Sequence, residues 1–527
     1  MKQITLEGSN VIFSFPFSWD TKEEVKRLGA RFNSARKVWY LPMNKADRIE
    51  DLLSIDKDWN VDDKVAKLLR SASEGLDFHY CLDERLPDGR LLYAHQKEAV
   101  QWALSMLQSR YKGGILALDM GLGKTLVALV TAKIYSQAFP EVKILVICPA
   151  FLNKNWWKEA NGVGINVEIY SWQKQPEVPS VSYLLIVDEA HYAQSGKKTQ
   201  RGKHFLNLCQ SAYCLGKLLL TGTPMKNGRP ANLLPLLQAI DHPIVENRRY
   251  YEERYCAAKR TKYCAWDTSG ASNLDELHRN VKDALFRRTK KECLDLPPKI
   301  RIMVTAEVTG QALDVYNRAK QQAILNYYEN SYANGAPLVL MTALRKAASR
   351  AKVQHAVTMA TELLEQEQQV VIFTEFLETA KELHQALGGC LLTGKTPVNQ
   401  RQDLVDRFQA GQERVFISIS GAGGVGITLT ASQNVILVDR ALTSGDVIQC
   451  EDRCHRIGTP TSVTCYWIQY DVIDERIDNL LTRKQSRIDL VLEGKRRTLR
   501  NTGGDPLDYI DEIAADLIRE MDPQNQL

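Results

Sequence analysis

The stretch Asp119-Met120-Gly121-Leu122-Gly123-Lys124-Thr125 decides the fold of this 527-residue chain. It stands between a short apolar run, 114–118, and an apolar segment, 126–132, whose composition is typical of a helix. Glycines between a strand and a helix let backbone N–H groups close around phosphate oxygens, and the first helical turn adds positive potential. Lys124 would add a point charge, and Thr125 would place a hydroxyl on Mg²⁺. The stretch therefore predicts a nucleoside triphosphate cradle in an α/β domain.

Two carboxylates follow another apolar run, 183–187. Asp188 and Glu189 come directly after it and precede Ala190-His191. Two carboxylates at the carboxyl end of a buried parallel strand are unfavourable unless they hold a cation. We expect Asp188 to coordinate Mg²⁺ through water and Glu189 to polarise the attacking water. The predicted metal-binding residues are thus Thr125, Asp188 and Glu189, and a capping pair at a strand–helix turn is the alternative interpretation.

Upstream of the glycine loop, Gln96 could read adenine through both faces of its amide, which would explain a preference for ATP. The predicted nucleotide-binding residues are therefore Gln96, Gly121, Leu122, Gly123, Lys124 and Thr125. A further strand, 217–220, ends in Thr-Gly-Thr-Pro, whose hydroxyl groups could relay the nucleotide state to a second lobe.

A second α/β alternation starts near Gln369, with strands expected at 370–374, 414–420 and 434–439 and a helix at 375–387. The loop after the second of these strands is rich in glycine but is not followed by Lys-Thr, so it does not predict a second nucleotide cradle. Its N–H groups suit the backbone phosphates of a nucleic-acid strand. The predicted DNA contacts in this segment are Ser420, Gly421, Gly423 and Gly424.

Two arginines, Arg453 and Arg456, lie in the stretch from Gln449 to Gly458. Their spacing of three residues predicts that they share one helix face, and a planar guanidinium suits phosphate. Placed across a cleft from Lys124, they would neutralise charge in the transition state as arginine fingers. The predicted catalytic residues are Lys124, Asp188, Glu189, Arg453 and Arg456. A salt-bridged Asp/Arg helix is the alternative for this one segment.

Residues 1 to about 80 carry no catalytic constellation. We expect a strand at 11–15 and a helix at 21–28 that is stopped by Gly29. Arg36 and Lys37 stand beside Trp39, which suits a nucleic-acid surface where cations meet phosphates and rings stack on bases. The alternative is that Trp39 belongs to the core and the cations form a solvated face.

The overall composition is that of an ordinary globular protein, with 44% apolar and 25% charged residues. Its 68 basic and 63 acidic side chains give a net charge of +5, so any nucleic-acid surface must arise from local segregation of charge. Eleven scattered cysteines without a C-x-x-C pair favour reduced thiols. We see no signal peptide or membrane-spanning run, and therefore expect cytoplasm or nucleoid for a bacterial or viral protein and the nucleus for a eukaryotic one.

The motifs in this order resemble those of superfamily 2 nucleic-acid ATPases, specifically the Swi/Snf-type branch. They are D-M-G-L-G-K-T, D-E-A-H, L-T-G-T-P, A-G-G-V-G and Q-x-E-D-R-x-H-R-I-G, between about residues 90 and 493. The N-terminal pattern K-x-x-G-A-R-F-x-x-x-x-K-x-W-x-x-P is similar to the HARP domain, the DNA-binding module of annealing helicases. Asn155 and Trp156 are also expected to contact DNA. Departures from the family pattern occur at Leu118, at 441–445 and at Thr459, and none of them removes a phosphate or Mg²⁺ group.

The expected fold class is α/β, with two RecA-like lobes that carry helical insertions and a small N-terminal α+β module. The expected domains are a HARP-like module at 1–80, lobe 1 with a helical protrusion at 90–297, an inter-lobe helical region at 298–352, lobe 2 at 353–493, and a tail or brace helix at 494–527.

The resemblance implies an ATP-driven double-stranded DNA translocase that uses ATP and Mg²⁺ and anneals strands or remodels forked DNA. Duplex, forked or branched DNA would be its partner, together with single-stranded-DNA-binding or replication proteins, and we expect a monomer. Two other classes stay open. One is a duplex translocase that displaces bound proteins without annealing, and the other is a nonenzymatic ATP-gated DNA clamp.

Overall fold

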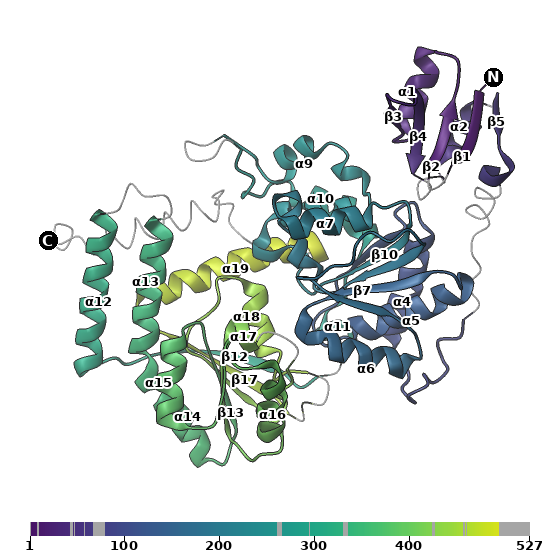
Figure 1. The fold of residues 1–527 in the computed structure, drawn as a ribbon. Helices are drawn as coiled ribbons and strands as arrows, with labels where there is room; N and C mark the ends of the chain where they lie inside the picture. Colours follow the sequence, from purple (N-terminus) through teal and green to yellow (C-terminus); the bar gives the residue numbers. More distant parts are fainter. Residues whose placement is uncertain are drawn as a thin grey trace. The chain divides into compact units, whose positions relative to one another are not determined.

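A computed structural model describes residues 2–7, 10–42, 46, 48–56, 58–66, 80–260, 266–294, 296–329, 336–423, 427–456, 459 and 461–494. Within these residues the chain forms three sheets, of five, six and six strands (Figure 1). The chain divides into two compact units. Unit 1 comprises 1–224, 232–251 and 280–288, and unit 2 comprises 225–231, 252–279 and 289–527.

The first six-stranded sheet lies in unit 1, and all its strands are parallel, in the order β11-β6-β10-β9-β7-β8. Its central strands read as continuous apolar runs because a parallel sheet is covered on both faces. All five residues of β9 are buried. The strands are β6 (Gly113–Leu116), β7 (Lys143–Cys148), β8 (Glu168–Ser171), β9 (Tyr183–Val187), β10 (Cys214–Leu220) and β11 (Leu285–Phe286). The strands predicted at 114–118, 183–187 and 217–220 are therefore confirmed.

The helices between residues 94 and 293 either connect these strands or lie in the segments inserted between them. They are α4 (Ala94–Gln108), α5 (Lys124–Ala138), α6 (Asn153–Val163), α7 (Gln200–Cys209), α8 (Leu234–Ala239), α9 (Arg248–Tyr255), α10 (Leu274–Val281) and α11 (Lys290–Cys293). Lobe 1 was expected to run unbroken from 90 to 297. Met225–Ala231 and Glu252–Arg279 instead group with unit 2.

The second six-stranded sheet lies in unit 2 and is also parallel, in the order β12-β17-β16-β13-β15-β14. Val371 and Phe373 of β13 pack into one apolar cluster, whereas Val370 and Ile372 pack into another. Both faces of this strand are therefore covered. The strands are β12 (Lys299–Thr305), β13 (Val370–Thr374), β14 (Cys390–Leu392), β15 (Val415–Ile419), β16 (Asn434–Leu437) and β17 (Val463–Gln469).

The helices of this second lobe are α12 (Gly310–Glu329), α13 (Ala336–Ala351), α14 (Val353–Glu365), α15 (Leu377–Leu387), α16 (Val398–Gln409), α17 (Ser420–Gly423), α18 (Ser444–Glu451) and α19 (Asp471–Glu493). Together with the parallel sheets they confirm the α/β class and the two RecA-like lobes. The segment 298–352 is not purely helical, because β12 forms the edge strand of the second sheet next to β17.

The last described helix, α19 (Asp471–Glu493), is much longer than the sequence predicts, since the residues themselves indicate a helix only from after Lys484 to about Leu492. It begins at Asp471, and its buried positions include Ile473, Ile477 and Leu481, which recur every four residues. Its N-cap is Tyr470, so the Ser, Thr or Asn that usually marks a helix start is missing from the sequence. The tail from 495 onwards lies outside the described residues.

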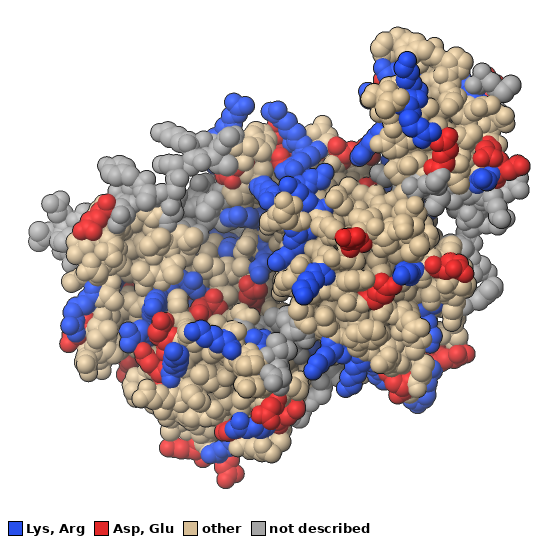
Figure 2. Space-filling view, viewed as in Figure 1, with Lys and Arg blue, Asp and Glu red and all other residues tan. Residues whose placement is uncertain are grey.

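The N-terminal module is a five-stranded sheet in the order β3-β4-β2-β1-β5. Its elements are β1 (Lys2–Glu7), β2 (Asn10–Ser14), α1 (Trp19–Arg27), β3 (Arg31–Asn33), β4 (Val38–Pro42), α2 (Ile49–Ile55) and β5 (Trp59–Val61). The predicted strand and helix are confirmed, and Gly29 follows α1 with a φ of 86° that favours glycine. In Figure 2, Lys and Arg gather over the part of this module that carries α1 and β3.

Two further expectations from composition can be compared with the described residues. The ten cysteines found there are free thiols, and eight of them are buried, as expected for reduced cysteines. Among the described helices, none combines the length and the apolar character that a membrane crossing requires.

Candidate nucleotide-binding and hydrolysis site

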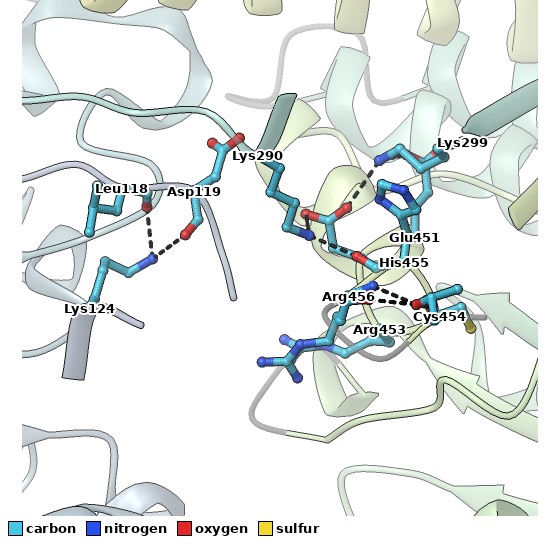
Figure 3. A network of polar contacts seen from close by, with 12 residues as sticks. Leu118, Asp119, Lys124, Lys290, Lys299, Glu451, Arg453, Cys454, His455 and Arg456 are labelled. Carbon is cyan, nitrogen blue, oxygen red and sulfur yellow. Dashed lines mark hydrogen bonds and ion pairs between the residues drawn. The ribbon is translucent and has the colours of Figure 1, made fainter. Parts of the chain in front are cut away.

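The glycine loop connects β6 to α5, as the sequence predicts. Gly121 and Gly123 have φ values of 85° and 82°, in the left-handed region that only glycine adopts without strain. Lys124 is the first residue of α5, and its Nζ donates to the carbonyl oxygens of Leu118 at 2.8 Å and Asp119 at 3.1 Å (Figure 3). Burial lowers the pKa of Lys124. A half-buried ammonium at a helix N-terminus, within a loop of glycines, fits a polyphosphate.

Gln96 supports this loop in a way that the sequence did not indicate. Its Oε1 accepts from the backbone N–H of Tyr93 at 3.1 Å, and its Nε2 donates to the carbonyl of Leu122 at 3.2 Å. Its side chain is buried, and a Cβ at position 123 would come within 2.3 Å of the Gln96 Nε2. Both ends of the amide are therefore engaged by the chain itself. Each of these contacts uses one of the two hydrogen-bonding positions at that end of the amide, and the reading of adenine by Gln96 stays a prediction.

His95 is a neighbour that sequence reasoning missed. Its Nε2 lies 3.1 Å from the carbonyl oxygen of Leu122, the same oxygen that Gln96 contacts. The only sequence signal is its position beside Gln96 at the start of α4. Two side chains of one helical turn thus hold the middle of the glycine loop.

A second missed support comes from β11 and the residues after it. Arg287 forms an ion pair with Asp119 at 2.7 Å and donates to the carbonyl of Ala117 at 2.9 Å. The backbone N–H of Asp119 also donates to the carbonyl of Arg288. In sequence this run, 286–290, resembles the HARP-type subgroup, and that resemblance says nothing of the glycine loop. Its role as a brace of the glycine loop needed the sheet order, since β11 lies beside β6.

The two carboxylates follow β9 directly, and both are buried. The Nε1–H of Trp156 donates to Asp188 Oδ2 at 2.9 Å, and the Nε1–H of Trp172 donates to the Asp188 backbone carbonyl at 2.9 Å. Burial, followed by the charge of Glu189, raises the pKa of Asp188 to about 6. Lys124 opposes this shift, so the three predicted catalytic groups of unit 1 lie within electrostatic reach of one another.

Glu189 is held in a constrained position. Its φ is 48°, which is uncommon for a residue with a side chain. His191 Nδ1 lies 3.1 Å from Glu189 Oε2 and 3.3 Å from the hydroxyl of Thr221, the first residue of the Thr-Gly-Thr-Pro turn. The turn after β10 is thereby linked to the carboxylate pair. Asp188, Glu189 and the Thr125 hydroxyl are hard oxygen donors, and two adjacent buried carboxylates need a cation, so the residues present fit Mg²⁺.

Trp156 was predicted to contact DNA, and the structure contradicts this. Its side chain is fully buried, and its one donor is engaged with Asp188. The buried residues of α6 are Trp156, Ala160 and Val163, which recur at helical spacing and could have shown that this ring faces the core. The adjacent Trp157 is 49% exposed, and Asn155 is exposed as expected.

Replacing Trp156 with Phe is therefore expected to lower kcat for ATP hydrolysis by about tenfold and to leave DNA affinity unchanged. The ring volume is largely kept, but Asp188 loses a hydrogen bond to a charged group, worth about 1.5–3 kcal/mol. Steady-state hydrolysis and DNA titration by fluorescence anisotropy measure the two effects. Trp157→Phe is the matched control. Weaker DNA binding by Trp156→Phe with normal hydrolysis would restore the original prediction.

In unit 2, Arg453 and Arg456 lie in the turn after α18 and do not share a helix face, because the helix ends at Glu451. The guanidinium groups nevertheless converge. Arg453 Nη1 donates to the carbonyl of Ile427 at 3.3 Å, and Arg456 Nη1 donates to the same oxygen at 3.2 Å and to the Thr428 hydroxyl at 2.9 Å. Both arginines thus contact the segment that follows the second glycine-rich loop.

The predicted DNA contacts of the second lobe are only partly accessible. The Ser420 side chain is buried and donates to the carbonyl of Thr374 at 3.4 Å, so a phosphate contact through its hydroxyl is wrong for this structure. Gly421 is exposed, and Gly423 is the last residue of α17. Gly424 lies outside the described residues.

In the N-terminal module, Arg36 and Lys37 are exposed, and Arg36 pairs with Glu7 at 2.6 Å. Trp39 is half-buried and packs against the core of the module, opposite Phe13 in the sheet and 5.5 Å from the ring of Phe32. The structure therefore favours the interpretation of Trp39 as a core residue, whereas the two cations remain available at the surface.

The two parallel sheets, the glycine loop and the buried carboxylate pair together define a two-lobed, RecA-like nucleotide-binding protein. Comparison with known families gives the particular branch. The SNF2-related domain matches residues 95–183 and 180–355, and the helicase conserved C-terminal domain matches residues 352–458. The chain belongs to the Swi/Snf-type family of superfamily 2 ATPases, as its motifs predicted.

Among curated relatives, the chain is 30% identical over 444 residues to the SWI/SNF-related matrix-associated actin-dependent regulator of chromatin subfamily A-like protein 1 homolog of Caenorhabditis elegans, covering 76% of this chain and 61% of that protein. It is 29% identical over 460 residues to the DNA annealing helicase and endonuclease ZRANB3 of Mus musculus, covering 79% of this chain and 42% of that protein. The chain thus spans about two fifths to three fifths of the length of these relatives.

Proposed function

We propose that this protein is an ATP-driven translocase on double-stranded DNA that anneals complementary strands or remodels forked DNA. The observation that carries this proposal is the joint placement of Lys124, Asp188 and Glu189 at the carboxyl ends of β6 and β9. Relatives named as DNA annealing helicases support the choice of substrate.

In the proposed reaction, residues 121–125 bind the polyphosphate of ATP. Thr125 and Asp188 would hold Mg²⁺, which would supply Lewis-acid polarisation of the phosphoryl oxygens when bound. Glu189 orients the attacking water and accepts its proton, with His191 fixing the carboxylate from the other side. Trp156 and Trp172 keep Asp188 in place through two indole N–H groups.

The second lobe would complete the reaction. Arg453 and Arg456 carry fixed positive charge, and we propose that they reach the transferring phosphoryl group when ATP draws the lobes together. Asn155 in the first lobe and the backbone of Gly421 and Gly423 in the second would grip the DNA backbone. Alternating grip by two lobes converts each round of hydrolysis into movement along the duplex.

The N-terminal module would direct this motor to forked or single-stranded DNA. Deleting residues 1–80 is expected to lower fork-stimulated hydrolysis by about tenfold and to change basal hydrolysis by less than about twofold, since a tethered second binding site raises local concentration without entering the catalytic site. Phosphate release with and without forked DNA measures both rates. Arg36→Glu with Lys37→Glu is the milder version, because both side chains are exposed. Equal loss of both rates would show that the module is merely structural.

Strand annealing separates the proposal from its alternative. The translocase is expected to reanneal a bubble held open by a single-stranded-DNA-binding protein in an ATP-dependent manner. Displacement of a roadblock protein from duplex DNA without reannealing would instead favour the motor that clears bound proteins.

A further inference from the structure

The turn that carries Arg453 and Arg456 is preceded by two buried carboxylates, Glu451 and Asp452. Glu451 is fully buried and Asp452 is 6% exposed. Two adjacent buried anions are unstable unless cations are bound to them, and the nearest arginines in sequence would be natural partners. The contacts of Arg456 lead elsewhere, to the neutral oxygens of Ile427 and Thr428.

Other cations occupy the carboxylates instead, and two of them come from β12. Arg301 binds Glu451 with both arms of its guanidinium, at 2.8 Å from Nε and 2.7 Å from Nη2. Lys299 Nζ lies between the acids, 3.0 Å from Glu451 and 3.1 Å from Asp452 (Figure 3). Trp467 of β17 adds an indole N–H to Glu451 at 3.0 Å. The first carboxylate is therefore surrounded by donors from the edge strand β12 and from its neighbour β17.

Lys290 joins the network from α11. Its Nζ binds Asp452 at 2.7 Å and donates to the carbonyl of His455 at 2.9 Å. His455 lies between the two arginines in the turn 452–456, which we call the arginine turn. The His455 ring reaches the Pro297 carbonyl through Nε2 at 2.8 Å. The segment from Lys290 to Arg301 thus holds the turn at both of its ends.

The electrostatics agree with this geometry. Burial raises the pKa of both acids, but Lys299 and Arg301 outweigh it for Glu451, and Lys299 and Lys290 outweigh it for Asp452, so both pKa values lie below their ordinary range. Both acids are therefore charged at neutral pH, and Lys290, Lys299 and Arg301 compensate their negative charges. Without those cations, Asp452 would become a strong acceptor close to the guanidinium of Arg456, whose pKa it already influences.

We propose that Lys290, Lys299 and Arg301 are positioning residues that occupy Glu451 and Asp452 and so leave the Arg456 guanidinium available for phosphate. The inference rests on the proposed ATPase function and adds the residues that set its arginine turn. It also has a mechanical consequence. Because these cations belong to the segment that enters the second lobe, a displacement of that segment would shift the arginine turn with it.

The test uses Lys299→Met in the full-length chain, with Lys320→Met as the matched control. Lys320 forms an ion pair with Asp471 at 2.6 Å in the same unit, and its side chain is 22% exposed, against 20% for Lys299. DNA-stimulated kcat of Lys299→Met is expected to fall about tenfold, with KM for ATP changed by less than about twofold, because an interaction made only in the transition state is lost. Lys299→Arg is expected to recover most of the rate.

A second measurement does not depend on ATP. Amide hydrogen exchange of the nucleotide-free protein over 453–459 is expected to accelerate in Lys299→Met and to stay at the wild-type rate in Lys320→Met. Arg301→Gln, whose side chain is 42% exposed in the wild type, serves if Lys299→Met does not fold. Equal turnover and equal exchange in the Lys299 and Lys320 variants would overturn the inference. A wild-type protein without DNA-stimulated hydrolysis would refute the proposed function, while the exchange comparison would still decide the role of the network.

Discussion

Replacing Arg456 with Ala is expected to lower kcat for ATP hydrolysis by about 10³-fold or more while ATP still binds. The guanidinium donates to both Ile427 and Thr428, so it can move onto a phosphoryl oxygen by exchanging two neutral acceptors for a charged one. The residues proposed to bind the nucleotide lie in unit 1, and the substitution lies in unit 2.

Phosphate release and binding of a fluorescent ATP analogue separate these two effects. Arg350→Ala is the matched control, since Arg350 is a surface arginine of the same unit that pairs with Glu382 at 2.9 Å. Near-normal turnover by Arg456→Ala would remove this arginine from the catalytic residues. A parallel loss of ATP binding would place it in ground-state binding instead.

Replacing Glu189 with Gln is expected to lower kcat by about 10²–10⁴-fold, the usual contribution of a general base. The amide has the shape of the carboxylate and can still meet His191, so the backbone at its positive φ should be kept. What is lost is the ability to accept the proton of the attacking water. The variant should therefore bind ATP and DNA together without turning over.

Single-turnover phosphate release and nucleotide binding measure this second effect. Glu177→Gln makes the same change at an exposed position of the first lobe and should leave the rate unchanged. If Glu189→Gln hydrolyses ATP at a rate close to that of Glu177→Gln, another group must activate the water.

The fold could be predicted from the sequence wherever an element is apolar throughout and ends in a distinctive turn. The runs at 183–187 and 370–374 are buried at every position, as such runs are in parallel sheets. β12 was missed because its residues are mostly exposed at the edge of the second sheet, so it lacks that signal. The start of α19 was missed because Tyr470 is not a usual N-cap.

The residues of the candidate site likewise fall into those that the sequence reveals and those that only the structure reveals. Lys124, Asp188 and Glu189 could be chosen because their chemistry and their place after a strand are both visible in the sequence. Trp156 was predicted to contact DNA, but its ring lies on the face of α6 that packs into the protein core. The exposed ring on this helix is that of Trp157. The supports of the site, such as Arg287 on Asp119 and Lys299 on Glu451, are distant in sequence and follow only from sheet order and packing.

The proposed translocase activity is tested most directly by measuring phosphate release from ATP with no DNA and with single-stranded, duplex, forked and gapped DNA at several salt concentrations. Duplex and forked DNA are expected to raise the rate well above the DNA-free rate, and the stimulation should weaken as salt increases, because phosphate contacts release counterions. Lys124→Ala should abolish the signal. A rate that is the same with and without DNA, or the same in wild type and Lys124→Ala, would contradict the proposed function.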